Sequence, residues 1–183
     1  MSQKIRNDIG TIVEFSKEIE QILKKDFNAK GKGLHGLLNS IKNYKLPDKT
    51  LKSLRWIAST RNKVLHEEDI EIKNIKQFIE TSKKIIIELK TLRIIEKIKT
   101  NLKIYLNSNH NDLNQLISQA EKKLPNEIII SLKKISTIKK INNQFEQDAI
   151  DVMVKLDNFI KKEKTLLGKL LSIIRYLKSF YNK

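Results

Sequence analysis

The chain has 183 residues, of which 39% are hydrophobic and 32% charged, so it is long and apolar enough to bury a core. It has no cysteine and only three histidines, which excludes a disulfide framework and a thiolate metal site; we expect no metal ion and no cofactor. With 37 basic and 21 acidic residues, its net charge of +16 favours a polyanionic partner, because neutralised phosphates release counterions. An over-use of lysine through AT-rich coding accounts for the same excess equally well.

The most apolar segments are not typical of membrane spans. The N-terminal stretch MSQKIRNDIG lacks the apolar core of a signal peptide. The segments IIIELKTLRII and LLGKLLSIIRYL carry charged residues at short intervals, far from the ~20 uninterrupted apolar positions of a spanning helix. We therefore expect a cytoplasmic protein.

Apolar residues recur every three or four positions along nearly the whole chain, which only five glycines and two prolines interrupt. This spacing predicts an all-α protein. A first helix with an apolar stripe from Ile5 to Leu23 ends at the glycine-bearing stretch 28–33, and a short helix follows over 34–44. Pro47 then starts a new helix, since proline is tolerated in the first turn of a helix but not in its interior.

The third helix is predicted from about Asp48 to His66. Its apolar face is expected to consist of Leu51, Leu54, Ile57, Ala58 and Leu65. Trp56 lies opposite this face, where it either stacks on a nucleic-acid base or packs against another chain. Packing is the simpler expectation for this side chain.

Two further helices are predicted in the rest of the chain. After the acidic segment 67–72, a long helix begins near Asn74 and runs past Tyr105 to the polar turn 107–112. The C-terminal segment 166–183, LLGKLLSIIRYLKSFYNK, is amphipathic and basic. A membrane-surface role has to be considered for such a helix, but packing against the rest of the chain is the simpler expectation.

Four segments recur in the same order in the two halves of the chain. The pairs are 46–66 with 124–144, 34–47 with 113–125, 19–23 with 95–99, and 75–89 with 156–170. The first pair shares Leu-Pro and Ser-Leu and aligns without a gap. This order indicates a tandem duplication. We therefore predict two tandem helical-bundle modules, residues 1–91 and 92–183, joined by the long helix.

An arginine interrupts the apolar face of the third helix. Placed at successive steps of ~100°, Arg61 falls between Ile57 and Leu65, while Asn62 and His66 share the border of that face. An arginine on an apolar face keeps its charge and needs partners for its five donors. A histidine one turn beyond can give or take a proton near neutral pH. These residue types suggest acid–base chemistry beside a bound anion.

The spacing Arg-Asn-x-x-x-His at the end of a helix in a small all-helical module resembles the motif of the HEPN superfamily, the higher eukaryotes and prokaryotes nucleotide-binding domains. In that motif a histidine follows an arginine by a few residues, usually with a polar residue after the arginine. The flanking segment 31–69 resembles bacterial members of a HEPN-like family of unknown function. The resemblance covers residues 10–90 and extends to the rest of the chain through the duplication. It implies two HEPN-like modules, the second of them degenerate.

Many HEPN proteins are ribonucleases that need no metal, and the resemblance implies such a reaction here. His66 would serve as general base or acid when the RNA 2′-hydroxyl attacks the adjacent phosphate. Arg61 would hold the non-bridging oxygens, and Asn62 would orient His66 or hydrogen-bond the phosphate. The products would end in a 2′,3′-cyclic phosphate. The resemblance further implies a role as a toxin or in phage defence.

Nucleic-acid contacts are expected from three further basic residues of the same helix, Lys52, Arg55 and Lys63.

The motif makes only half a site on a straight helix, because Arg61 and His66 point about 140° apart at ~100° per residue. In the HEPN superfamily two motifs meet across a dimer interface, which implies a homodimer here. The matching positions of the second module, Lys139, Lys140 and Gln144, cannot replace them. Glutamine exchanges no proton, and lysine lacks the planar fork that holds a phosphate. The second module is therefore expected to be catalytically empty.

Three other interpretations remain open at this stage. A non-catalytic module would bind RNA, a partner HEPN protein, an antitoxin or an acidic protein surface through its basic faces. A DNA-binding regulator is disfavoured, since no helix-turn-helix signature is found. In a purely structural role, Arg61 would pair with a carboxylate such as Glu14, and Asn62 and His66 would bond helix-end carbonyls.

Overall fold

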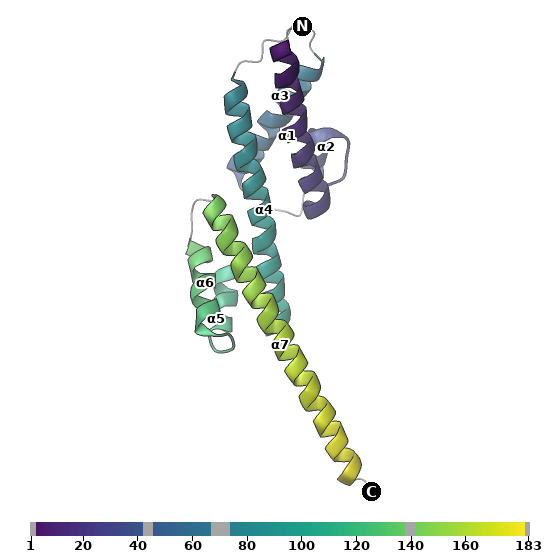
Figure 1. The fold of residues 1–183 in the computed structure, drawn as a ribbon, viewed down its shortest axis with the longest axis vertical. Coiled ribbons are helices and arrows are strands. Elements are labelled where there is room, and N and C mark those ends of the chain that lie inside the picture. Colours follow the sequence, from purple (N-terminus) through teal and green to yellow (C-terminus); the bar gives the residue numbers. More distant parts are fainter. Residues whose placement is uncertain (1–2, 42–45, 67–73, 138–141, 182–183) are drawn as a thin grey trace. The chain divides into compact units, whose positions relative to one another are not determined.

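The structure is a computed structural model that describes residues 3–41, 46–66, 74–137 and 142–181, with side chains described up to residue 172 (Figure 1). These residues form seven α-helices: α1 (Gln3–Phe27), α2 (Gly33–Ser40), α3 (Asp48–His66), α4 (Ile75–Leu106), α5 (Leu113–Ala120), α6 (Asn126–Thr137) and α7 (Asn143–Tyr181). No strand occurs within the described ranges, so the all-α prediction is confirmed. The acidic segment 67–72 and the positions Lys139 and Lys140 lie outside them.

The helices divide into two compact units. The first comprises residues 1–93 with 141–143, and the second comprises residues 94–140 with 144–183. The division falls inside α4, whose two halves contribute to different units. In the described part of the chain, no helix is long and apolar enough to cross a bilayer. That the units are HEPN-like modules stays a prediction.

The first unit is built around α3, which packs against α1 and α2. Helix α3 begins directly after Pro47. Proline has no N–H to donate, and the Pro47 carbonyl accepts a hydrogen bond from the Leu51 N–H at 3.0 Å. Buried apolar side chains from α1, α2, α3 and the first half of α4 form one continuous core. The buried hydroxyl of Thr50 donates a hydrogen bond to the Glu88 carboxylate, which ties α3 to α4.

The apolar face of α3 agrees with the prediction except in its last turn. Leu54, Ile57 and Ala58 are fully buried, whereas Leu65 is 41% exposed and Val64 is buried instead. The assignment of Leu65 to the core was therefore wrong. Helical spacing gives the direction of a side chain, whereas its burial depends on which other segments pack against that turn of the helix.

Trp56 packs inside the first unit. Its ring lies 5.8 Å, centroid to centroid, from the ring of Phe78 on α4, with the planes tilted by 42°. The side chain is 38% exposed, so its outer edge reaches solvent. The ring partner of this tryptophan belongs to the same chain, whereas the predicted packing against another chain stays a prediction.

The second unit consists of the second half of α4 with α5, α6 and α7. Asp112 caps α5, because its carboxylate accepts hydrogen bonds from the backbone N–H groups of Asn114 at 2.9 Å and Gln115 at 3.1 Å. The amide of Asn101 on α4 donates a hydrogen bond to the Asp157 carboxylate on α7. These contacts supplement a core of buried leucine, isoleucine, valine and phenylalanine side chains from all four helices.

The two units share local features at matching positions. Asn28 follows α1 with a φ of 51°, and Asn107 follows the last residue of α4 with a φ of 50°; the left-handed conformation is one that asparagine tolerates better than most residues. The next helix, α2 or α5, has eight residues in both cases. Pro47 directly precedes α3, and Pro125 directly precedes α6. These features agree with the predicted duplication.

The two units differ at the positions of the Arg61-to-His66 motif. Helix α3 has 19 residues and ends at His66, whereas α6 has 12 residues and ends at Thr137. Gln144, the residue that aligns with His66, lies in the first turn of α7 and donates a hydrogen bond to Asp148 at 3.0 Å. The positions that align with Arg61 and Asn62 come shortly after Thr137 and lie outside the described residues.

Truncation of the buried face of α3 tests this packing. Leu54→Ala is expected to lower the free energy of unfolding by about 2 to 5 kcal/mol, because removing part of a fully buried leucine leaves a cavity. The matched control is Leu65→Ala on the exposed end of the same helix, which is expected to cost less than about 1 kcal/mol. Urea denaturation followed by circular dichroism measures both values, and equal losses would contradict the assigned face.

Candidate functional site

The candidate site lies on the last two turns of α3. Arg61 and Asn62 are half-buried, whereas His66 is exposed at the last residue of the helix. Arg61 emerges on the side of α3 that carries the buried Ile57 and Val64, as the sequence predicted for its position. A guanidinium in such a place has to reach the edge of the apolar surface to satisfy its donors.

Arg61 satisfies one donor within the motif itself. Its Nη1 donates a hydrogen bond to Oδ1 of Asn62 at 3.1 Å. Because Asn62 and His66 are four residues apart, they lie one turn from each other along the same border of the helix. The bond therefore directs the guanidinium from the apolar side toward the border that carries His66. This reach reduces the angular separation of about 140° expected from their Cα positions alone.

The alternative pairing of Arg61 with the first helix is not observed. Glu14 of α1 is exposed, and within the described part of the chain Asn62 is the hydrogen-bond partner of Arg61. His66 has no hydrogen-bond or ion-pair partner among the described residues, which leaves its imidazole accessible. The amide nitrogen of Asn62 still has two N–H donors for an anion.

The predicted nucleic-acid contacts lie on the exposed side of α3. Lys52, Arg55 and Lys63 are all exposed. At ~100° per residue these three residues, together with His66, fall within an arc of about 80°. A ligand that binds along this side of α3 as far as His66 would therefore contact three exposed, positively charged side chains.

A second histidine joins this surface from α2. Nε2 of His35 lies 3.4 Å from Oγ of Ser59, an exposed residue of α3 one turn before Asn62. This contact between α2 and α3 was not among those predicted from the sequence. No sequence signal pointed to it, since the two residues are 24 positions apart and only the packing of α2 on α3 brings them together.

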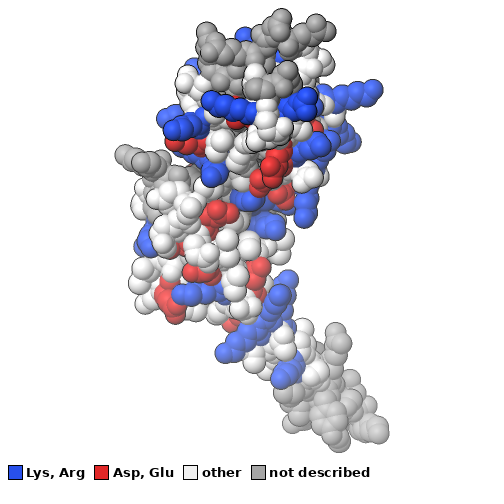
Figure 2. Space-filling model, turned by 45° about the horizontal axis from the view of Figure 1, so that its top comes forward, with Lys and Arg blue, Asp and Glu red and all other residues white. Residues whose placement is uncertain are grey.

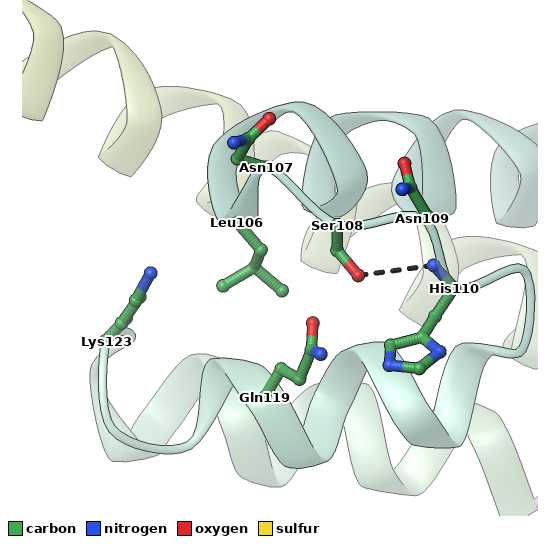
Figure 3. A pocket seen from close by; sticks show the side chains of 7 residues that line it. All are labelled: Leu106, Asn107, Ser108, Asn109, His110, Gln119 and Lys123. Atoms are coloured by element: carbon green, nitrogen blue, oxygen red, sulfur yellow. Dashed lines mark hydrogen bonds between the residues drawn. The ribbon is translucent and has the colours of Figure 1, made fainter.

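Two hollows in the second unit are weaker candidates. The larger, about 390 Å³, lies at the turn after α4, where the side chains of Leu106, Ser108 and His110 point toward Gln119 (Figure 3). Ser108 Oγ accepts a hydrogen bond from the backbone N–H of His110 at 3.3 Å. The lining is amide-rich and contains no carboxylate. Its titratable side chains are His110 and Lys123, and its lining includes no arginine that could bind a phosphate through two parallel hydrogen bonds.

The smaller hollow, about 160 Å³, is lined by charges that neutralise each other. Lys134 lies 2.7 Å from Asp148, and hydrogen bonds from Lys134 and then Gln144 hold the pKa of the Asp148 carboxyl below its usual range. The hydrogen bond to Glu127, at 2.5 Å, raises the pKa of Lys155. Groups that stay ionised at neutral pH are poor proton donors or acceptors there.

No metal-binding cluster of histidine, aspartate or glutamate side chains occurs among the described residues. The side chains on α3 can instead bind an anion through Arg61 and Asn62 and exchange a proton through His66. The structure joins Arg61 to Asn62 by a hydrogen bond, whereas His66 lies at the end of the same helix with no described hydrogen bond to either residue. The second-module positions Lys139 and Lys140 lie outside the described residues, and Gln144 lies on α7.

Comparison with known proteins yields no match: no protein-family model, no curated protein and no solved structure matches the chain. The HEPN resemblance therefore depends on the motif Arg61 to His66 and its flanking segment, and membership of the superfamily stays a prediction.

A double-mutant cycle on Arg61→Ala and Asn62→Ala tests the geometry of the site. We expect a coupling of about 0.5 to 1 kcal/mol in the free energy of unfolding, the usual size for a partly exposed hydrogen bond with one charged partner. The control cycle combines Arg61→Ala with Lys63→Ala, an exposed neighbour on the same helix, and is expected to give no coupling. A zero result in both cycles would show that Arg61 and Asn62 act independently.

Proposed function

We propose that the chain is a metal-independent endoribonuclease of the HEPN type that acts in phage defence or as a toxin. The observation that supports this proposal best is the hydrogen bond from Arg61 to Asn62, which directs a guanidinium toward the border of α3 that carries His66. Few structural roles demand an arginine on the apolar side of a helix and an accessible histidine one turn beyond it.

The chemistry follows from these side chains. The imidazole of His66 removes the proton of the RNA 2′-hydroxyl, and the resulting oxygen attacks the adjacent phosphorus. The bond from phosphorus to the 5′-oxygen then breaks, and that oxygen takes up a proton. Arg61 donates hydrogen bonds to the non-bridging oxygens, where negative charge develops, and Asn62 adds its amide N–H groups. The products are a 2′,3′-cyclic phosphate and a free 5′-hydroxyl.

A complete site requires a second proton-transfer group. The aligned residue of the second unit, Gln144, cannot supply one, because a carboxamide does not exchange protons near neutral pH. Two chains that pair through their first units would provide two copies of His66, one as base and one as acid. The proposed enzyme is therefore a homodimer.

Cleavage of total RNA in the presence of EDTA tests the proposal. The purified protein is expected to cut RNA, and His66→Ala is expected to lose at least about a hundredfold in rate, because general acid–base catalysis typically contributes that much or more. The matched control is His110→Ala, which removes an exposed histidine of the second unit and should leave the rate unchanged. Gel electrophoresis follows the cleavage, and treatment of the products with a cyclic phosphodiesterase identifies their termini.

Two results would refute the proposal. One is equal activity of the wild type and His66→Ala, since the imidazole would then take no part in the reaction. The other is a monomeric mass in light scattering at micromolar concentration, because a lone Arg61 and His66 would lack their counterparts.

A non-catalytic RNA-binding module is the second candidate. It is favoured by the net charge of +16 and by the lack of any described partner that would orient His66. Binding by this module would weaken by about 10³-fold or more between about 50 and about 200 mM salt if six or more phosphates are contacted.

A gel-shift titration separates the two candidates. A binder would retain its affinity in His66→Ala and lose it when Lys52, Arg55 and Lys63 are replaced together by alanine. Loss of cleavage without loss of affinity in His66→Ala would instead identify the ribonuclease.

A further inference from the structure

The C-terminal part of α7 continues past the helix that supports it. Tyr105, the residue before the last residue of α4, packs its ring edge-on against Phe159 of α7, with the centroids 5.9 Å apart. Helix α4 ends at Leu106, whereas α7 continues to Tyr181 (Figure 1). Residues beyond this contact therefore have no stretch of α4 beside them.

Four leucines are exposed on this continuation of α7. Leu166, Leu167, Leu170 and Leu171 are 54%, 55%, 54% and 52% exposed. The expectation that this helix packs against the rest of the chain was therefore wrong for these residues. A contiguous row of exposed large apolar side chains is unusual on a soluble surface and marks a site of interaction.

In the first unit, the residues that align with these leucines are covered by another helix. Ile85, Ile86 and Leu89 of α4 align with Leu166, Leu167 and Leu170, and they are buried. There α1 runs beside α4, as the ion pair of Lys90 with Glu18 at 3.2 Å shows. In the second unit the corresponding helix stops before it reaches the leucines.

The helix is amphipathic around these leucines. At ~100° per residue, the four leucines span an arc of about 140°, while Gly168 and Ser172 fall outside it. Lys164 lies about 20° beyond one edge of the arc, and Lys162 about 40° beyond the other. Both lysines are exposed. Figure 2 shows basic side chains, in blue, on the described part of this continuation of α7. The four leucines thus form a broad apolar face with a lysine along each side. Glu163 falls within the same arc but lies at the N-terminal end of the face, where it interacts with Tyr105 of α4.

The charge of this segment decides between the possible occupants of the apolar face. Residues 161–183 contain seven basic residues and one acidic residue. Two copies of such a helix would repel each other, and the apolar arc is wider than the narrow seam of a coiled coil. An anionic bilayer surface matches both features, because it takes up a broad apolar face at the acyl boundary and attracts the flanking lysines.

We propose that the segment 161–172 of α7 docks in the plane of an anionic membrane surface. The four leucines enter the boundary between headgroups and acyl chains, and Lys162, Lys164 and Lys169 extend toward the lipid phosphates. The helix lies on the bilayer and does not cross it. This surface is separate from the motif on α3 and does not depend on ribonuclease activity.

Co-sedimentation of the full chain with vesicles tests the proposal. The protein is expected to bind vesicles of phosphatidylcholine mixed with phosphatidylglycerol, and not vesicles of phosphatidylcholine alone. The double variant Leu167→Ser/Leu170→Ser is expected to lose at least about tenfold in affinity, because it removes half of the apolar face. Lys164→Gln and Lys169→Gln are each expected to lose about fivefold.

The matched control is the double variant Ile104→Ser/Ile130→Ser, which alters two isoleucines of the second unit that are 65% and 67% exposed. It should bind vesicles as tightly as the wild type. Circular dichroism of each variant checks that helical content is kept. His66→Ala should also bind unchanged, so that a failed ribonuclease assay and a failed vesicle assay remain distinguishable.

Three outcomes would overturn the proposal. Equal binding to neutral and anionic vesicles would remove the electrostatic part, and an equal loss in the isoleucine control would show that the leucines have no special role. In the third, the protein binds neither kind of vesicle, and light scattering gives a dimeric mass for the wild type and a monomeric mass for the leucine variant. A second copy of the chain would then be the occupant of the face.

Discussion

The candidate site depends on how a half-buried guanidinium satisfies its donors. Arg61 emerges on the side of α3 that packs into the first unit, and its bond to Asn62 directs it to the edge of that surface. Removal of an arginine from water is unfavourable unless each donor finds a partner, so the arrangement restricts both side chains. One consequence is a positive, planar group directed toward the border of α3 that ends at the exposed His66. The site thus follows from packing as much as from the motif.

The two units show how one pattern supports different surfaces. Both place a left-handed asparagine after a long helix, an eight-residue helix next, and a proline before the helix that follows. In the second unit, Gln144 on α7 is the residue that aligns with His66, and it cannot exchange a proton near neutral pH. Helix α7 also continues far beyond α4 and exposes Leu166 and Leu170. Under the proposed functions, the first unit retains the chemistry and the second provides a docking surface.

The positively charged residues differ in whether a carboxylate neutralises them. In the described part of the second unit, several lysines are paired with carboxylates, such as Lys134 with Asp148 and Lys155 with Glu127. These pairs contribute little attraction for a polyanion. The lysines beside the leucines of α7 and those on the exposed side of α3 are better placed for phosphate groups. The same type of charge would thus serve RNA on one helix and lipid headgroups on another, with apolar contacts present only in the second case.

The sequence by itself determined the helical class, the limits of α3 and the span of α4, because apolar spacing and proline positions act within a few residues of the chain. It also identified Arg61, Asn62 and His66 as neighbours on one helix. Only the tertiary structure decided which apolar residues of a helix are buried. Leu65 and the leucines of α7 are exposed, because burial depends on whether another helix packs against that turn. The contact between His35 and Ser59 has the same origin, since packing between distant segments leaves no local pattern to read.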